Sequence, residues 1–231
     1  MFKSRSQKLE RIDTGDYTSE EYNQFLIDIR FINRFAGDNW ALRKTLLKEI
    51  ASEDLKTFSV LDIGAGSGEL LRTIAKFSKK QNRKVALFGL ELNARSANSI
   101  IEESLNFPQI NAVRANALKL PFADDSFDFV ISSLFTHHLT EQEIVASLEE
   151  MSRVSRKGIF VIDLHRHPIA YLSYKLFCVG FRISKLVRED GSLSVLRGFK
   201  SHEMKSLARN ANLKQISVER RFPYRLVLGG R

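Results

Sequence analysis

The sequence predicts a doubly wound α/β domain with a mostly parallel sheet. Short apolar runs alternate with amphipathic segments between residues 58 and 164. The run at 159–164 is apolar at almost every position, which is typical of a parallel strand covered on both faces. A glycine-rich turn follows the first expected strand. This alternation implies right-handed crossovers within one open sheet.

Two helices are expected before the first strand. The first begins at a capping box formed by Thr18 and Glu21. The second follows Gly37, with Asp38 placed to cap it. We therefore expect residues 1–54 to form an N-terminal helical cap.

Residues 55–231 are expected to form the α/β domain itself. Strands are predicted at 58–63, 85–90, 110–113, 127–133 and 159–164, and helices at 70–77, 93–105, 140–154 and 201–210. The apolar and basic stretch 168–187 precedes a turn at Gly191, and we expect 166–200 to be an insertion that covers the substrate. The strands at 214–222 and 224–228 are separated by Pro223, which predicts an antiparallel or bent pair at the sheet edge.

Composition excludes several classes of protein. Cys178 is the single cysteine, so an internal disulfide and a cysteine-rich metal site are excluded. Residues 1–10 have no apolar run typical of a secretory signal, and no uncharged apolar run reaches the ~18 residues of a membrane span. We expect a cytoplasmic protein, with peripheral membrane contact as a further option.

Charge is unevenly distributed along the chain. Residues 1–150 contain 19 basic and 22 acidic side chains, whereas residues 151–231 contain 17 basic and 5 acidic ones. A basic C-terminal third predicts an anionic partner: a nucleic acid, a membrane surface, an acidic carrier protein or an acidic substrate. A solvated basic face without a partner is the alternative.

The strongest motif is the glycine loop at 60–70, which contains Gly64, Gly66 and Gly68. Glycines at alternate positions let the backbone turn tightly and approach a ligand closely. In a dinucleotide-binding loop the third glycine would come one residue later, where this chain has Glu69. An acidic side chain there disfavours a pyrophosphate, and a P-loop is excluded because no Gly-Lys-Ser/Thr follows.

A carboxylate, Glu91, ends the second expected strand. At this position a carboxylate can accept hydrogen bonds from the two hydroxyls of a ribose. An N-cap role for the next helix is the alternative. The pairing with the glycine loop favours the ribose.

These motifs resemble the successive SAM-binding motifs of class I S-adenosylmethionine (SAM)-dependent methyltransferases. The stretches that carry the resemblance are 60–70, 89–91, 115–120 and 125–139, and 120–128 is similar to a stretch of the ubiquinone and menaquinone methyltransferase subgroup. The resemblance implies a seven-stranded Rossmann-like fold, an enzyme, and SAM as the cofactor, with S-adenosylhomocysteine as its product.

The resemblance also implies which residues hold the cofactor. Asp62 and the glycine loop (Gly64, Ala65, Gly66 and Gly68) would hold the methionine moiety, and Glu91 the ribose. Asn116 and Ala117 would lie against the adenine, and Leu92 would pack on it or be an ordinary buried leucine. Ser132, at the end of the strand at 127–133, is placed with the cofactor-binding residues.

Histidines gather after two strands that should be neighbours in the sheet. Four of the five follow 127–133 and 159–164, namely His137, His138, His165 and His167. Because a histidine suits proton transfer near neutral pH, we predict His165 as the catalytic base, with His138 second. A structural or substrate-lining role is the alternative for His137 and His138. No metal is expected, because the spacing fits no zinc pattern.

Further residues are predicted around the acceptor. Arg166 would hold an anionic acceptor or face solvent, and Asp163 would orient His165 or cap the next turn. Tyr171 and Arg34 are predicted to line the substrate site. With the N-terminal helices, the stretch after the fifth strand would close an apolar pocket that excludes water.

A narrower resemblance concerns the substrate. The stretches 29–35, 163–168 and 221–226 resemble small bacterial methyltransferases encoded beside type III polyketide synthases. This implies O-methylation of a phenolic polyketide or lipid in secondary metabolism, and thus a small hydrophobic or phenolic partner. The alternatives are an RNA methyltransferase that uses the basic C-terminal third, although nucleic acid is not expected as the partner, and a SAM-binding protein without catalysis.

Overall fold

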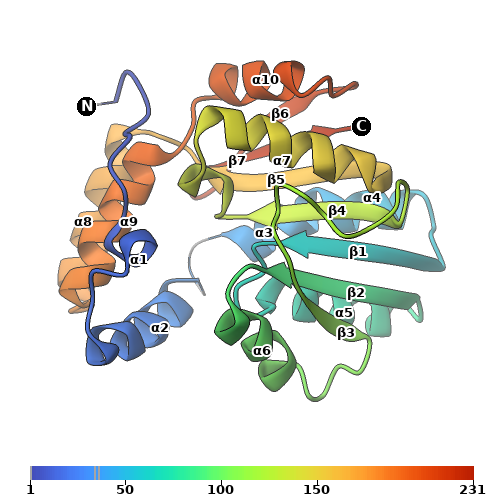
Figure 1. The fold of residues 1–231 in the computed structure, drawn as a ribbon, viewed down its shortest axis with the longest axis horizontal. Coiled ribbons are helices and arrows are strands. Elements are labelled where there is room, and N and C mark those ends of the chain that lie inside the picture. Colours follow the sequence, from blue (N-terminus) through green and yellow to red (C-terminus); the bar gives the residue numbers. More distant parts are fainter. Residues whose placement is uncertain (1, 34, 36) are drawn as a thin grey trace.

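The structure is a computed structural model that describes residues 2–33, 35 and 37–231. Its centre is a seven-stranded sheet in the order β3-β2-β1-β4-β5-β7-β6 (Figure 1). The strands are β1 (Thr57–Ile63), β2 (Lys84–Glu91), β3 (Ile110–Arg114), β4 (Phe127–Ser133), β5 (Ser155–Leu164), β6 (Ser217–Arg221) and β7 (Arg225–Gly230). The first five run parallel, and β7 lies antiparallel between β5 and β6. The predicted α/β fold class is confirmed.

Alternate side chains of the central strands enter two hydrophobic cores, one on each face of the sheet. Leu61, Val130 and Val161 belong to the first core, whereas Val60 and Phe129 belong to the second. Because both faces are covered, these strands are apolar at nearly every position.

Helices cover both faces of the sheet. The first core is closed by α7 (Glu141–Arg153) and α10 (Ser201–Asn210). The second is closed by α3 (Asp38–Lys44), α4 (Leu46–Ser52), α5 (Glu69–Lys80) and α6 (Ala94–Glu103). The chain is therefore wound on both faces, as the alternation of elements predicts.

Four helices gather beyond the carboxyl ends of β1, β2 and β4 (Figure 1). They are α1 (Arg11–Thr14), α2 (Ser19–Asn33), α8 (Pro168–Gly180) and α9 (Lys185–Arg197). A third core joins α2, α8 and α9, with Cys178 and Val187 packed against Phe25 and Ile29 of α2. In α/β folds ligands bind at this end of the sheet, so these helices are placed to cover a ligand.

The predicted capping box of α2 is confirmed. The Glu21 amide donates to Oγ1 of Thr18, and the Thr18 amide donates to the Glu21 carboxylate. The second predicted helix is instead divided at Thr45 into α3 and α4. Asp38 does not cap it: the Asp38 carboxylate accepts two hydrogen bonds from buried Arg225.

The turn predicted at Gly191 is wrong, because Gly191 lies inside α9. A Cβ atom at this position would lie 2.0 Å from the hydroxyl of Tyr174. That hydroxyl donates to the carbonyl of Val187 at 2.7 Å. The glycine therefore lets α8 and α9 pack closely and does not end a helix.

Candidate functional site

The glycine loop connects β1 to α5 in a left-handed backbone conformation. Gly64, Gly66 and Gly68 have φ values of 69°, 57° and 79°. A Cβ atom at Gly64 would lie 2.7 Å from the ring of Phe135, in the segment after β4. Only glycine fits this close approach without strain, so the loop is held against the end of the neighbouring strand.

Two carboxylates lie beside this loop. Glu91 accepts a hydrogen bond from the Gly66 amide at 2.6 Å. Asp62 is buried, and its Oδ1 atom has no hydrogen-bond partner among the residues that the structure describes. Burial raises the pKa of both groups, and Glu91 raises that of Asp62 further.

This pair suits a ligand with an ammonium group and hydroxyls. A buried carboxylate oxygen without a partner is costly, and a cation or a hydroxyl donor would satisfy it. The amino acid and ribose parts of SAM supply these groups. The residues present therefore fit SAM, with Asp62 and the glycine loop at its methionine moiety and Glu91 at its ribose.

One cavity of about 940 Å³ extends from these carboxylates to the N-terminal helices. On the side of the sheet it is lined by Asp62, Gly64, Ala65, Gly66, Ser67 and Glu91. Beyond them its wall is mostly apolar and comes from α2, α8 and α9, including Phe25, Leu26, Ile29, Ile32, Ala170, Phe177, Val187 and Val195. The cavity thus joins a polar compartment to an apolar one.

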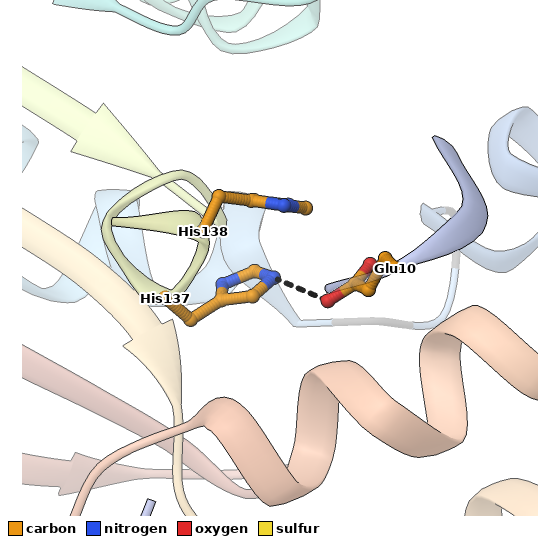
Figure 2. Close-up of side chains that lie close together, drawn as sticks. All are labelled: Glu10, His137 and His138. Atoms are coloured by element: carbon orange, nitrogen blue, oxygen red, sulfur yellow. Dashed lines mark ion pairs between the residues drawn. The ribbon is translucent and has the colours of Figure 1, made fainter. Parts of the chain in front are cut away.

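Polar side chains line the cavity at Glu10, His137 and His138, which we call the Glu-His-His cluster (Figure 2). One ligand atom from each side chain lies within 4.8 Å of the others. Nε2 of His137 is 3.9 Å from Oε1 of Glu10. The two histidines belong to the short 3-10 helix η1 (Thr136–His138) after β4, whereas Glu10 comes from the N-terminal segment.

Each histidine of the cluster is oriented by a second carboxylate. Nδ1 of His137 is 2.7 Å from Oδ1 of Asp163, and Nδ1 of His138 is 2.9 Å from Oδ1 of Asp13. Asp163 is fully buried, which would raise its pKa, but electrostatic attraction to His137 and hydrogen bonds from His137, Thr136 and the Leu164 amide lower that pKa to about 2. Both rings therefore have their Nδ1 atoms engaged, which leaves Nε2 for the cluster.

The N-terminal segment is fastened over η1 by buried polar contacts. Arg197 donates to the carbonyls of Lys8, His137 and His138. Asp190 accepts hydrogen bonds from the amides of residues 11 and 12. Glu10 and Asp13 are thereby held at the histidines from more than 120 residues away in the sequence.

His165, the predicted base, also lines the cavity. Burial and the nearby Arg220, His167 and Lys200 lower its pKa to about 4. The sequence predicted that Asp163 orients His165, but the Asp163 carboxylate instead contacts Nδ1 of His137. His138, the second predicted base, lines the cavity together with His137.

Several predicted site residues lie outside the cavity lining: Gly68, Leu92, Asn116, Ala117, Ser132, Arg166 and Tyr171. Their own contacts explain this for three of them. The Asn116 side chain accepts from the Leu118 amide, and the Ser132 hydroxyl donates to the Ile63 carbonyl. Tyr171 packs edge-on against Phe2.

Leu92 is an exposed side chain, and Ala117 is part of the first core. Arg166 neither faces solvent nor lines the cavity. It is buried, with hydrogen bonds to the carbonyls of Phe2, Lys3 and Gly198 and an ion pair with Glu203. Arg34 lies outside the described residues.

Comparisons with known proteins agree with this geometry. Residues 60–158 match a family model described as "Methyltransferase domain". The chain is 32% identical over 107 residues to the ubiquinone/menaquinone biosynthesis C-methyltransferase UbiE of Rickettsia prowazekii. That match covers 45% of this chain and 42% of the relative, so the chain spans less than half of the relative's length.

Solved structures show the same fold at low identity. The plantazolicin methyltransferase BamL, solved with a desmethyl-plantazolicin analog and S-adenosylhomocysteine, matches with a TM-score of 0.70 at 13% identity, over 91% of this chain and 90% of that one. The magnesium protoporphyrin IX methyltransferase of Synechocystis PCC 6803 matches with a TM-score of 0.63 at 13% identity, over 96% and 99% of the chains. Residues 60–158 thus match a methyltransferase-domain model, and the chain has the same fold as these methyltransferase structures.

Proposed function

We propose that the protein transfers the methyl group of SAM to a small, largely apolar acceptor, and that this acceptor is the hydroxyl of a phenolic polyketide or lipid. The observation that carries the proposal is the single cavity of about 940 Å³ that joins the Asp62 and Glu91 compartment to an apolar one. A donor at the carboxylates and an acceptor among the apolar side chains would share one partly open cavity. Methyl transfer needs this alignment, since the sulfonium is already activated.

The apolar compartment favours a substrate with rings or an alkyl chain. Its wall includes Phe25 and Ile29 of α2, Phe177 of α8 and Val187 of α9. A pocket of this kind gains affinity by burying apolar surface and gives orientation through a few polar groups. The Glu-His-His cluster supplies those groups here.

The reaction forms a bond between the acceptor oxygen and the methyl carbon. The bond between that carbon and sulfur breaks, and its electron pair stays on sulfur, while the acceptor proton leaves to a base or to water. His165 remains the base predicted from the sequence, but a histidine whose pKa is about 4 takes up a proton weakly at neutral pH. The arrangement of His137 and His138 therefore supports the cluster as the place where the acceptor hydroxyl binds.

A second candidate is methylation of a ring carbon. It is favoured by the similarity to proteins named ubiquinone/menaquinone biosynthesis C-methyltransferases. The same cavity would accept a quinol ring with either its carbon or its oxygen toward the donor. The position of the label in the product separates the two.

The experiment is transfer of tritium from methyl-labelled SAM to an extract of lipids and phenols, with total RNA in a parallel tube. Label in the organic-soluble fraction is the expected result, and mass spectrometry of the product then distinguishes an O-methyl from a C-methyl group. Label in RNA alone would overturn the proposal in favour of the basic C-terminal third as an RNA-binding surface. SAM binding without label in either tube would favour a SAM-binding protein without catalysis.

Comparison of His165→Gln with His138→Gln locates the acceptor. If the acceptor hydroxyl binds at the cluster, His138→Gln should lower turnover at least tenfold while leaving SAM affinity unchanged. If His165→Gln instead lowers turnover more than His138→Gln, His165 would be favoured as the catalytic base.

A further inference from the structure

We propose that the Glu-His-His cluster binds a divalent transition-metal ion. Two imidazoles and one carboxylate are the ligands that zinc and iron(II) take in sites that keep positions open for a substrate. The three side chains converge from separate parts of the chain on one wall of the cavity (Figure 2). Open positions on the ion would therefore face the acceptor compartment.

The residues that contact the three ligands also resemble those around known metal sites. A metal-binding histidine typically donates its second ring N–H to a carboxylate, which fixes the ring and its tautomer. Both histidines here have such a partner, Asp163 at 2.7 Å and Asp13 at 2.9 Å. The two rings lie 4.2 Å apart between centroids, and one ring nitrogen of each lies within 4.8 Å of the other.

The third ligand has an unsatisfied buried oxygen. Glu10 is 3% exposed, and its Oε1 atom has no hydrogen-bond partner within the described part of the chain, although Nε of Arg197 lies 3.8 Å from it and donates to the His137 carbonyl. A buried carboxylate oxygen without a hydrogen bond is unfavourable, and an ion coordinated directly to it would remove this cost. Ligand atoms on an ion at ~2.1 Å lie roughly 3–3.5 Å apart. From separations of up to 4.8 Å, small side-chain rotations would bring these atoms onto one ion.

The ion would have a direct chemical role if the proposed methyl transfer is correct. An acceptor hydroxyl bound at an open position has a lowered pKa, so its proton leaves to water and the oxygen stays on the metal as an anion. That oxygen then takes the methyl carbon from the sulfonium. Metal binding itself does not depend on this step and is tested separately.

The test is titration of the full-length, metal-free protein with Co²⁺, followed by visible absorption, and with Zn²⁺, followed by calorimetry. We expect one Co²⁺ per chain with the absorption of a nitrogen- and oxygen-ligated site, displaced by Zn²⁺. Glu10→Gln and His138→Ala should each weaken binding at least tenfold, and Asp13→Asn about 10- to 100-fold through His138. His202→Ala removes an exposed histidine on α10 and is the matched control, with no expected change.

Absence of stoichiometric binding would overturn the metal site, as would binding that Glu10→Gln and His138→Ala leave intact. Circular dichroism and SAM binding of each variant establish that it is folded. Full methyl transfer by the chelated protein would overturn the ion's role in the reaction and leave the proposed methyl transfer standing. Stoichiometric Co²⁺ binding without methyl transfer would support the metal site and overturn the proposed methyl transfer.

A second inference rests on a different observation, the outward face of α8. Ile169, Leu172, Leu176 and Val179 are 55–66% exposed. At 100° per residue they fall on one stripe about 80° wide. Large apolar side chains in such a stripe are rare on a helix whose other face already packs in a core, and they mark a contact surface.

We infer that this stripe lies against an anionic lipid surface. The exposed cations Lys175, Arg182, Lys185 and Arg188 are on α8, on α9 or in the turn between them. Apolar side chains flanked by cations suit the boundary between anionic headgroups and acyl chains. Phe181, also exposed, packs against Phe177 and Phe35, which line the cavity. The surface is therefore continuous with the apolar compartment, a route for an apolar acceptor.

The test is co-sedimentation of the full-length protein with phosphatidylcholine vesicles that contain or lack phosphatidylglycerol. We expect binding to the anionic vesicles that decreases with salt, and at least a tenfold loss in the double variant Leu172→Ser/Leu176→Ser. Leu105→Ser, which changes a leucine that is 79% exposed after α6, is the control and should bind as the wild type. No binding to anionic vesicles, or a dimer in sedimentation velocity that the double variant abolishes, would overturn the inference.

Discussion

Among single residues, Asp62 and Glu91 are the carboxylates of the cavity lining beside the glycine loop. Glu91 accepts a hydrogen bond from the Gly66 amide, and under the proposed function it would also accept hydrogen bonds from the ribose of SAM. Glu91→Gln keeps an acceptor for Gly66 but removes the charge that strengthens hydrogen bonds to ribose hydroxyls. We expect SAM affinity to fall about 10- to 100-fold, or roughly 1.4–2.8 kcal/mol. Calorimetry with S-adenosylhomocysteine measures this, and Leu105→Ala should bind as the wild type.

His165 gives a prediction about pH. Its pKa is about 4 because it is buried near Arg220, His167, Lys200 and Arg166. The unfolded chain, with an ordinary histidine pKa near 6.5, binds more protons than the native state between about pH 4 and 6.5. Stability should therefore decrease as pH falls through this window, and His165→Gln should lessen the decrease. Urea unfolding at several pH values measures this, and an imidazole that titrates near 6.5 by NMR would contradict it.

Among the elements, the contact between α8 and α9 depends on one glycine. An added methyl group at Gly191 would collide with the Tyr174 hydroxyl, which is held by its bond to Val187. Gly191→Ala should destabilise the protein by about 1–3 kcal/mol, the usual cost of overpacking. Gly180→Ala, at the end of α8 where a Cβ atom meets no neighbour within 4 Å, is the matched control and should be neutral or slightly stabilising. Thermal unfolding compares the two, and equal melting temperatures would contradict the close packing.

The elements also show why some predictions succeeded and others failed. The strands and the glycine loop are local patterns, so their positions follow from spacing alone. Gly191 is different, because a glycine inside a helix looks like a turn unless its neighbour Tyr174 is known. Arg166 is a similar case, because its burial depends on carbonyls near residue 2 and on Glu203.

Across the whole molecule, the cavity wall at the Glu-His-His cluster is formed by residues that are far apart in the sequence. No spacing in the sequence connects Glu10 and Asp13 with His137 and His138, so a search for metal-ligand spacing fails even though the four side chains meet. The prediction for Asp163 was partly right. This carboxylate orients a histidine, as expected, but the histidine is His137 of η1 and not the neighbouring His165. The sequence thus pointed to the carboxylates and the first two glycines of the cavity lining, Asp62, Gly64, Gly66 and Glu91, whereas the meeting of Glu10 with the two histidines needed the tertiary structure.

The division of the cavity into two halves has a measurable consequence for the whole molecule. SAM at 100 times its Kd should stabilise the native state by about 2.7 kcal/mol, or roughly 5–10 °C in Tm for a chain of this size. Because Asp62 and Glu91 lie at the carboxyl ends of β1 and β2 while the cluster is built on η1 and the N-terminal segment, His138→Ala should show the same SAM-induced shift as the wild type. Glu91→Gln, with a tenfold weaker Kd, should retain only about 1.4 kcal/mol of this stabilisation at the same SAM concentration. If His138→Ala instead lost the shift, donor and acceptor compartments would be coupled, and binding at the cluster would have to be measured with SAM already present.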